Sequence, residues 1–284
     1  MITHNGKYLS VGTHHGMPIV AATMGGKMIL DGKWLQPATQ LAIMAAFGSV
    51  EGGEVIVKTN DYLNAIAATD PTRAQQLAMF IQEDPMLVCS LVETSKVRSV
   101  LGNNSGYFDT NIKVTGHNVD FMFRTQKYPT NSDCAVHLTA RNSWAYDIYG
   151  LFTRSGAKQI TYHGSEQVFM PFYEFNIYKF VTNIEDSSGT VTNLTTGETK
   201  THTLDLVPSA DDGLKVLGFK DSTRCSTVGC IHLIIDNGST AHFVPYRDPS
   251  TGEMELLDIL TGNLATRVGT FTEQLTSKTT EITS

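Results

Sequence analysis

Three acidic side chains lie close together in the stretch FVPYRDPSTGEMELLDILTGNLATRVGTF, residues 243–271. Carboxylates on alternate residues of a strand share one face, and a glycosidase needs two carboxyl groups that flank one bond. Glu253 and Glu255 share such a face, whereas Asp258 falls on the opposite one. The spacing therefore favours a strand between two Thr-Gly turns, with Asp258 capping a turn. A carbohydrate-active enzyme (glycosidase) stays open as the alternative function.

The nine histidines and four cysteines show no metal-ligand spacing. His232 and His242 lie at equal separations from Asn237, so we expect them to meet across a hairpin. Cross-strand packing explains such a pair at least as well as a metal does. The sequence thus predicts no metal site and no cofactor. Cys225 and Cys230 flank a short loop; a bridge between them stays open, and free buried thiols are favoured.

Motifs for nucleophilic or phosphate chemistry are absent: the chain has no G-x-S-x-G, Walker or G-x-G-x-x-G sequence. We therefore predict no catalytic residue. The remaining lead is aromatic, because Tyr and Trp rings can stack on sugars. Trp144, Tyr146 and Tyr149 lie close together and form the candidate glycan-binding set, with Trp144 and Tyr146 on one strand face. Burial in a core is the alternative role for these rings.

Composition places the chain among globular proteins of one large or two medium domains. It has 284 residues, 41% hydrophobic and 17% charged, with a net charge of −7. No cluster of Lys and Arg indicates a nucleic-acid groove. The N-terminus MITHNGKYLSVG lacks the pattern of a secretory signal, and no apolar run approaches the ~18 residues of a membrane span. We expect neither secretion nor membrane insertion.

Residues 1–95 are predicted to form a mixed α/β segment. Glycine-rich turns separate short strands. A helix is expected over residues 37–47, and a second one opens at Asp70-Pro71 and ends at Asp84-Pro85. Between the helices, residues 54–58 (EVIVK) read as a single strand. The predicted short strands cover residues 7–11, 18–23 and 27–30.

Residues 96–275 are predicted to form an antiparallel β-sandwich, and residues 276–284 a polar tail. Short β-rich runs recur at spacings typical of a sandwich. Asn237-Gly238 is the strongest hairpin signal in the chain. The predicted strands cover residues 119–124, 135–140, 145–152, 174–181, 190–194, 201–206, 214–219, 231–235 and 254–260. The fold class is therefore mainly β, with a smaller N-terminal α/β segment.

The ordered motifs of the β-rich part resemble a known family. GYFDTNI (residues 106–112) matches an opening phrase Y-I-D-T-G-I, with Asn111 in place of the usual Gly. The closing part reads GCIHLIIDNG (229–238), HFVPYR (242–247) and GEMELLD (252–258). In this order the motifs are similar to those of concanavalin A/LamG-like jelly-roll domains on gut phage and prophage virion proteins (Bacteroides, crAss-like). Leu257 and Asn263-Leu264 depart from the aromatic residues usual there, so the chain is a diverged member.

The resemblance implies a non-enzymatic virion structural protein of a tailed phage, such as a head fibre, capsid decoration or tail-fibre component. It implies that residues 1–95 anchor or oligomerise the protein on capsid or tail proteins. A homotrimer exposed on the particle surface, after assembly in the host cytoplasm, is expected. The jelly roll would project outward and bind host-surface glycans. A bacterial surface adhesin is a third reading, which the missing signal pattern disfavours.

Overall fold

A computed structural model describes residues 34–103, 105–128, 134–141, 149–154, 158–162, 167–208, 211–219 and 225–277, together with the backbone of short strands before residue 34. The chain divides into two compact units, Met1–Thr94 and Ser95–Ser284. This division lies one residue from the boundary expected from the change in sequence pattern.

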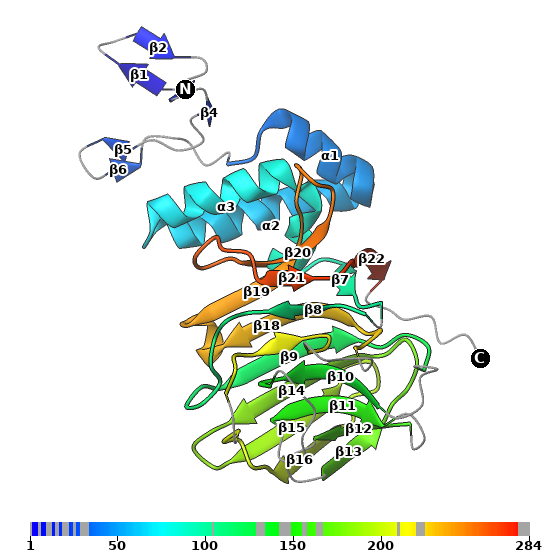
Figure 1. The fold of residues 1–284 in the computed structure, drawn as a ribbon. Coiled ribbons are helices and arrows are strands. Elements are labelled where there is room, and N and C mark those ends of the chain that lie inside the picture. The colour runs from blue at the N-terminus through cyan, green and yellow to red at the C-terminus, as the bar shows by residue number, and fades with distance from the viewer. Residues whose placement is uncertain are drawn as a thin grey trace. The chain divides into compact units, whose positions relative to one another are not determined.

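The first unit contains short β-hairpins followed by helices (Figure 1). Each hairpin pairs two neighbouring strands in antiparallel fashion. The strands are β1 (Ile2–His4), β2 (Lys7–Leu9), β3 (Thr13–His14), β4 (Met17–Pro18), β5 (Thr23–Met24) and β6 (Lys27–Met28). The helices are α1 (Pro37–Phe47), α2 (Ser49–Ala67), α3 (Pro71–Glu83), the 3₁₀ turn η1 (Pro85–Leu87) and α4 (Val88–Leu91). None of the described helices is long and apolar enough to cross a membrane.

Helices α1 and α3 begin and end where the sequence predicts. Each has a proline at its start, and Gly48 follows the last residue of α1. The Asp70 carboxylate accepts a hydrogen bond from the Arg73 backbone N–H at 2.9 Å, which satisfies one of the free donors at the start of α3. Pro71 fits the first helical position, where its missing N–H is not needed. At the other end, Asp84 accepts from the Met86 N–H at 3.3 Å and starts η1.

The strand predicted over residues 54–58 is wrong, since this segment lies inside α2. Glycines and β-branched residues disfavour a helix by only a few tenths to ~1 kcal/mol each, and packing overrides that preference. Val55, Leu63 and Thr59 are buried on one helical face. Gly52 allows a close approach to α1: a Cβ there would lie 2.5 Å from the Met44 Cα.

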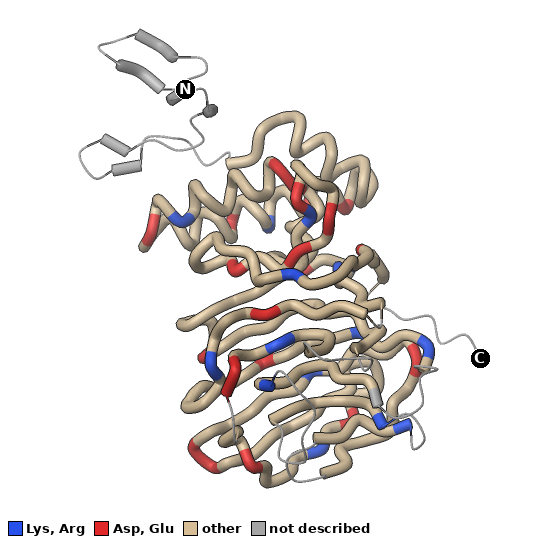
Figure 2. The backbone as a smooth tube through the Cα atoms, in the orientation of Figure 1, with Lys and Arg blue, Asp and Glu red and all other residues tan. Residues whose placement is uncertain are grey.

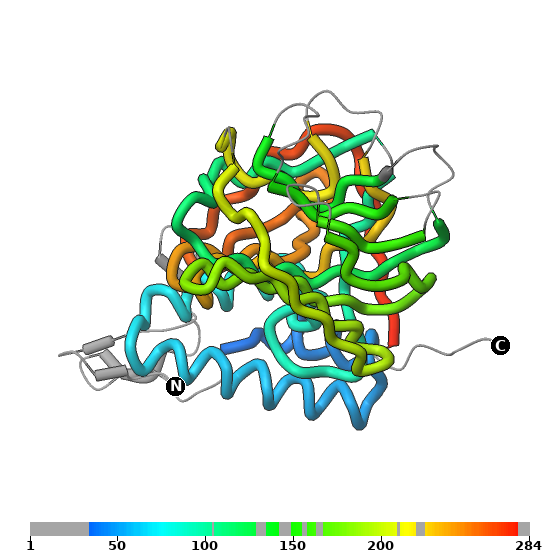
Figure 3. The backbone as a smooth tube through the Cα atoms, turned by 90° about the horizontal axis from the view of Figure 1, so that it is seen from below, coloured from blue at the N-terminus to red at the C-terminus, as the bar shows by residue number. Residues whose placement is uncertain are grey.

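The second unit is a sandwich of two sheets whose named strands pair in antiparallel fashion (Figures 1 and 3). The predicted β-sandwich is therefore confirmed. The seven-stranded sheet has the order β13-β12-β11-β10-β17-β8-β21. Its strands are β8 (Tyr107–Asp109), β10 (Cys134–Thr139), β11 (Gly150–Arg154), β12 (Gln159–Tyr162), β13 (Gln167–Pro171), β17 (Lys215–Val216) and β21 (Thr266–Val268).

The nine-stranded sheet has the order β16-β15-β14-β9-β18-β19-β20, with β7 beside β18 and β22 beside β7. The strands are β7 (Lys96–Leu101), β9 (Val119–Arg124), β14 (Ile177–Asn183), β15 (Ser188–Asn193), β16 (Thr199–Thr203), β18 (Gly229–Ile235), β19 (Ala241–Arg247), β20 (Met254–Asp258) and β22 (Thr272–Ser277). Thr276 and Ser277, predicted to open the tail, pair with β7 instead. Residues 278–284 lie outside the described residues.

The core lies between the two sheets and is rich in aromatic rings. Phe121, Phe123 and Phe180 are fully buried residues from the nine-stranded sheet. They meet buried residues of the other sheet, including Tyr162 and Phe169, and Phe169 packs edge-on against Phe180 at a centroid distance of 5.9 Å. Burying each such side chain stabilises the fold by roughly 1.5–3 kcal/mol. This shared core holds the loops at the rim of the sandwich in place.

Asn237-Gly238 turns the β18–β19 hairpin as predicted, with both residues at positive φ (52° and 84°). Cys225 and Cys230 are buried and form no disulfide with each other, which confirms the favoured reading of two unbridged, buried thiols. Burial raises the pKa of the Cys230 thiol and so disfavours the reactive thiolate. Lys and Arg are interspersed with Asp and Glu along the described backbone of this unit (Figure 2).

Candidate functional site

The structure tests one of the three aromatic residues predicted to bind glycan. Tyr149 is only 2% exposed, and its ring packs edge-on against Tyr162 at a centroid distance of 5.8 Å. Burial raises the pKa of the Tyr149 hydroxyl. A ring with no exposed face cannot stack on a sugar, so the prediction for Tyr149 is wrong and core packing is its role. Trp144 and Tyr146 lie outside the described residues.

The acidic cluster that opened the sequence analysis is divided between two roles. Met254 and Leu256 of β20 enter the core, whereas Glu255 takes the other face of the strand. The Arg267 guanidinium bridges the neighbouring acids, 2.8 Å from Glu255 and 3.4 Å from Glu253. Burial raises the pKa of Glu255, partly offset by the Arg267 charge. The Glu253 and Glu255 carboxylates therefore form ion pairs with Arg267, and these pairs join β20 to β21.

Asp258 caps the turn that follows β20, as predicted. Its Oδ1 accepts from the backbone N–H groups of His242 at 2.9 Å and Leu260 at 3.1 Å. Its Oδ2 accepts from the Thr261 hydroxyl at 2.6 Å. Both oxygens of this carboxylate therefore accept hydrogen bonds that stabilise the turn and tie it to the neighbouring strand β19. The geometry thus leaves no shared cleft for the three acids.

His232 and His242 meet across the β18–β19 hairpin as expected, with ring centroids 6.0 Å apart and edge-on. On the same face, the Lys179 ammonium lies 2.7 Å from the Asp120 carboxylate, and His232 lies 3.4 Å from it. Burial lowers the pKa of His242 to about 4, which keeps its ring neutral at physiological pH. The described part of the chain contains no group of three His, Cys, Asp or Glu that could hold a metal ion.

A groove of about 660 Å³ lies where two turns of the second unit come together. One turn joins β13 to β14, and the other joins β15 to β16. An exposed tyrosine, two glutamates and an asparagine amide line it. The complete lining is Tyr173, Glu174, Asn176, Thr195, Thr196, Gly197 and Glu198. This set combines a ring with oxygen acceptors and an amide donor, and we take it as the candidate functional site.

The buried hydroxyl of Thr125 holds the turn between β13 and β14 in place. Thr125, which is fully buried, donates from Oγ1 to the Tyr173 carbonyl at 2.6 Å and accepts from the Asn176 N–H at 2.9 Å. The Tyr178 hydroxyl accepts from the Tyr173 N–H at 2.9 Å. Glu174 Oε1 accepts from the Tyr128 N–H at 3.0 Å. Groups held in this way lose little conformational entropy on binding a ligand.

The second turn is fixed in the same manner. The side-chain oxygen Oδ1 of Asn193 accepts from the N–H groups of Thr195 at 3.0 Å and Thr196 at 3.2 Å. The Thr195 hydroxyl accepts from the Ile177 N–H at 3.1 Å and so ties this turn to β14. Gly197 has φ 80°, a conformation that favours glycine. Both walls of the groove are therefore preorganised.

The rim of the groove presents apolar rings to solvent. Tyr173 is 44% exposed, and the neighbouring Phe175 is 36% exposed. Phe175 also has φ 63°, a left-handed conformation that is unusual for a bulky residue and costs about 1–3 kcal/mol. Strain of this kind, together with exposed aromatic surface, is typical of binding sites.

Sequence reasoning missed this groove because Glu174 was assigned to a strand over residues 174–181, which in fact begins at Ile177. A signal is present in the sequence of the other wall, where Thr196-Gly197-Glu198 has the composition of a turn. Nothing in the sequence pairs that turn with Tyr173, since the pairing follows from the β14–β15 register.

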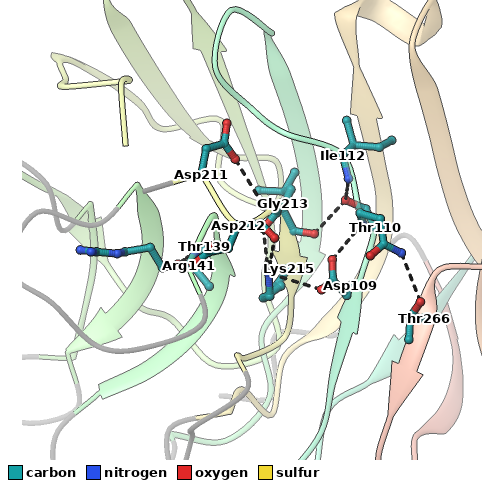
Figure 4. Close-up of polar contacts among 12 residues, drawn as sticks. Asp109, Thr110, Ile112, Thr139, Arg141, Asp211, Asp212, Gly213, Lys215 and Thr266 are labelled. Atoms are coloured by element: carbon teal, nitrogen blue, oxygen red, sulfur yellow. Dashed lines mark hydrogen bonds and ion pairs between the residues drawn. The ribbon is translucent and has the colours of Figure 1, made fainter. Parts of the chain in front are cut away.

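A second polar cluster surrounds the fully buried Lys215 (Figure 4). Its ammonium donates to the carbonyls of Asp212 at 2.9 Å and Gly213 at 3.0 Å, and it lies 3.4 Å from Asp109 Oδ2. Asp109 Oδ1 accepts from the Asn111 N–H at 2.9 Å. Asn111, which replaces the usual Gly of the opening motif, has φ 59°. This motif therefore builds a turn and a counter-charge for Lys215.

No family model matches the sequence. No curated protein matches it either. Solved structures with similar folds include the K499G mutant of NanB sialidase from Streptococcus pneumoniae, with 10% identity, 61% of this chain and 38% of that chain covered, and a TM-score of 0.35. Mouse laminin α1 domains LG4-5 show 14% identity over 64% of this chain and 46% of that chain, with a TM-score of 0.36.

The LG1-3 region of the laminin α2 chain gives 10% identity over 62% of this chain and 53% of that chain, with a TM-score of 0.35. The protein thus spans roughly two fifths to half of the length of these three chains. None of the TM-scores reaches 0.5, so these similarities support no conclusion about ligand or activity. The sandwich assignment rests on the strand order of the molecule itself.

Proposed function

We propose that the second unit is a non-enzymatic glycan-binding module of a virion structural protein. The observation that supports glycan binding is the Tyr173 groove: an exposed ring beside fixed carboxylate, amide and hydroxyl groups. Tyr173 can stack on the apolar face of a sugar ring. Glu174, Glu198 and Asn176 can hydrogen-bond the sugar hydroxyls, and hydrogen bonds to carboxylates are the stronger kind.

The virion setting is supported by the ordered motifs of the β-sandwich, whose residues occupy the turn and capping positions described above. In this proposal the protein is a head fibre, capsid decoration or tail-fibre component of a tailed phage. The first unit attaches it to other virion proteins, and the chain is a homotrimer with no nucleic-acid or membrane partner. Imaging of purified virions with an antibody to the protein tests this setting, and particles that carry none of it contradict the setting.

The glycan arm is tested by screening the full-length protein on an array of bacterial surface glycans. We expect Tyr173→Ala to weaken binding to the strongest glycan by about tenfold, since a stacked ring contributes about 1–2 kcal/mol. Phe175→Gly removes the second ring and relieves its backbone strain, so we expect weaker binding without loss of stability. Leu264→Ala is the matched control, because Leu264 is also 44% exposed but is not among the residues that line the groove.

An array profile that is the same for the wild type and Tyr173→Ala would remove this groove from the proposal. The alternative function is a glycosidase. The observation behind it is that two carboxylates, Glu174 and Glu198, line the same groove. A reducing-end assay on bound glycans separates the two functions. Hydrolysis that is lost in Glu174→Gln or Glu198→Gln would contradict the non-enzymatic assignment.

A further inference from the structure

Three asparagine side chains line a second, smaller pocket of the β-sandwich. The pocket has a volume of about 230 Å³ and lies where β9 begins, between the end of β14 and the turn of the β18–β19 hairpin. Its lining includes Asn118, Asp120, Val181, Asn183 and Asn237. It shares no lining residue with the Tyr173 groove. This asparagine pocket is therefore a separate place on the same unit.

The strand register brings two of the three amides side by side. β9 pairs with β14, and Asp120 lies opposite Val181. Continued by two residues, the same register places Asn118 opposite Asn183. Opposite residues of an antiparallel pair project to one face, with Cβ atoms about 4.5–5.5 Å apart. The Ile184 backbone N–H donates to Asn118 Oδ1 at 2.9 Å, so the two segments are still in contact at this point.

Backbone groups fix the orientation of both amides. Asn118 Oδ1 is held by the Ile184 N–H, and Asn183 Oδ1 accepts from the Glu185 N–H at 3.0 Å. A side-chain amide has one acceptor oxygen and an NH₂ group with two donors. Within the described part of the chain, neither NH₂ group donates to a protein atom. Asn118 and Asn183 therefore offer oriented donors to a ligand.

The third amide comes from the tight turn between β18 and β19. Asn237 has φ 52° and an exposed side chain. The neighbouring Asp236 anchors this turn to the start of β9, because its Oδ1 accepts from the Asn118 backbone N–H at 2.9 Å. Its Oδ2 accepts from the Thr240 hydroxyl at 2.7 Å. The turn that carries Asn237 is thus tied to the segment that carries Asn118.

Asp120 and Val181 add an acceptor and an apolar surface to the pocket. The Lys179 ammonium lies 2.7 Å from the Asp120 carboxylate, and His232 lies 3.4 Å from it. Burial acts to raise the pKa of Asp120, but the hydrogen bonds from His232 and Lys179 outweigh it and lower the pKa. The carboxylate is therefore ionised at neutral pH, and each of its oxygens can accept a further hydrogen bond. The Lys179 charge balances that of Asp120.

We propose that the asparagine pocket binds one neutral sugar ring, with Asn118, Asn183 and Asn237 donating to its hydroxyl oxygens. A sugar hydroxyl also carries a proton, which it can donate to Asp120, while the Val181 side chain contacts the C–H groups of the ring. The oxygens of Asn118 and Asn183 are already occupied, so the pocket offers donors where a hard cation would need oxygen ligands.

The size of the pocket suits a single ring. Its volume lies below the roughly 300–1,000 Å³ of pockets for drug-sized ligands. The inference rests on the proposed glycan-binding function for its class of ligand, but it concerns a different site. It adds a second place at which the same module contacts a glycan.

Titration of the ¹⁵N-labelled full-length protein with neutral methyl glycosides tests this site through the NMR signals of the asparagine NH₂ groups. The probes are the methyl glycosides of glucose, galactose, mannose and fucose. We expect at least one of them to shift the Asn118 and Asn183 signals in a saturable manner. Each signal is assigned by its loss in Asn118→Asp or Asn183→Asp, and the signal of the other asparagine then reports the affinity of that variant.

The two Asn→Asp variants keep the oxygen that accepts from the backbone and replace the NH₂ donors by a carboxylate oxygen. We expect each to weaken binding by about fivefold or more, because a hydrogen bond to the ligand is lost. Asn263→Asp makes the same change at an exposed turn residue outside the pocket and is the control. Val181→Phe fills the pocket without changing an amide, and an aromatic residue suits a strand. We expect this variant to fold and to lose binding.

Wild-type Asn118 and Asn183 signals that stay in place with all four glycosides would overturn the proposal. So would an affinity that is the same in Asn118→Asp, Asn183→Asp and Val181→Phe as in the control. The array experiment with Tyr173→Ala reports on the Tyr173 groove, whereas this titration reports on the asparagine pocket. Either site can therefore fail its test while the other passes.

Discussion

Acidification from pH 7 to pH 4.5 is expected to lower the free energy of unfolding by about 2.5 kcal/mol through His137 alone. His137 is 1% exposed in the core, and burial lowers its pKa to about 3. Its ring nitrogens lie 2.6 Å from the hydroxyls of Ser226 and Thr153. A neutral imidazole satisfies both contacts with one donor and one acceptor. Protonation would place a positive charge on this buried ring, and neither of these two contacts is a carboxylate that could balance it.

The sign of the effect follows from the two states of the chain. The pKa in the unfolded chain is near 6.5, above the folded value, so the unfolded state binds the proton first as the pH falls. The contribution of His137 is intact above pH 6.5. It is lost between pH 6.5 and pH 3, at about 1.4 kcal/mol per pH unit.

Urea denaturation at pH 7 and pH 4.5 measures this loss. His137→Gln keeps one donor and one acceptor but cannot take up the proton. We expect it to be less stable at pH 7 and to lose about 2.5 kcal/mol less than the wild type on acidification. His202→Gln, at a position that is not fully buried, is the control. His242 contributes part of the remaining acid sensitivity, since its pKa also lies low. An unchanged pH dependence in His137→Gln would contradict the prediction.

The strands of the sandwich were predictable because each must alternate between a core face and a second face. Val119 to Arg124 alternates in this way, and β9 has the predicted bounds. Helix α2 was not predictable by the same reasoning. Its Gly52-Gly53 and its β-branched residues are locally typical of a turn and a strand. Packing of Val55 and Leu63 decided the outcome, and such tertiary contacts cannot be read from local preference.

The groove was hidden for a related reason: its walls are far apart in the sequence. Tyr173 and Glu198 meet because β14 pairs with β15, and only the register brings their turns together. Tyr149 shows the converse case, in which a residue type suited to sugar stacking belongs to the core.

The ordered motifs of the β-sandwich explain more of the fold than of the function. Asn111, Asn237, Gly252 and Gly262 all have positive φ, and Asp258 caps a turn. These positions need a particular residue type because of backbone geometry. A sequence can therefore keep the order of such motifs while its binding residues change. For this reason the function must be argued from the groove and tested there.

Replacement of Lys215 is expected to be the most destabilising of the changes considered. Lys215→Met keeps the buried aliphatic stem but removes an ammonium whose donors reach two carbonyls and Asp109 (Figure 4). The two carbonyls and the Asp109 carboxylate then lose their partner. Removing one member of a buried ion pair typically costs about 3–5 kcal/mol, so we expect guanidinium denaturation to show a loss of that size.

The Asp109 carboxylate accounts for part of this cost, and a second variant separates it. Lys215→Met combined with Asp109→Asn leaves no uncompensated charge, so we expect the double variant to be more stable than Lys215→Met alone by about 1–2 kcal/mol. The exposed Lys200→Met is the control, with an expected change within about 0.5 kcal/mol. A loss below about 1 kcal/mol for Lys215→Met would show that the ammonium is not needed as an internal counter-ion. In that case Asp109 and the 212–213 carbonyls must be satisfied by water.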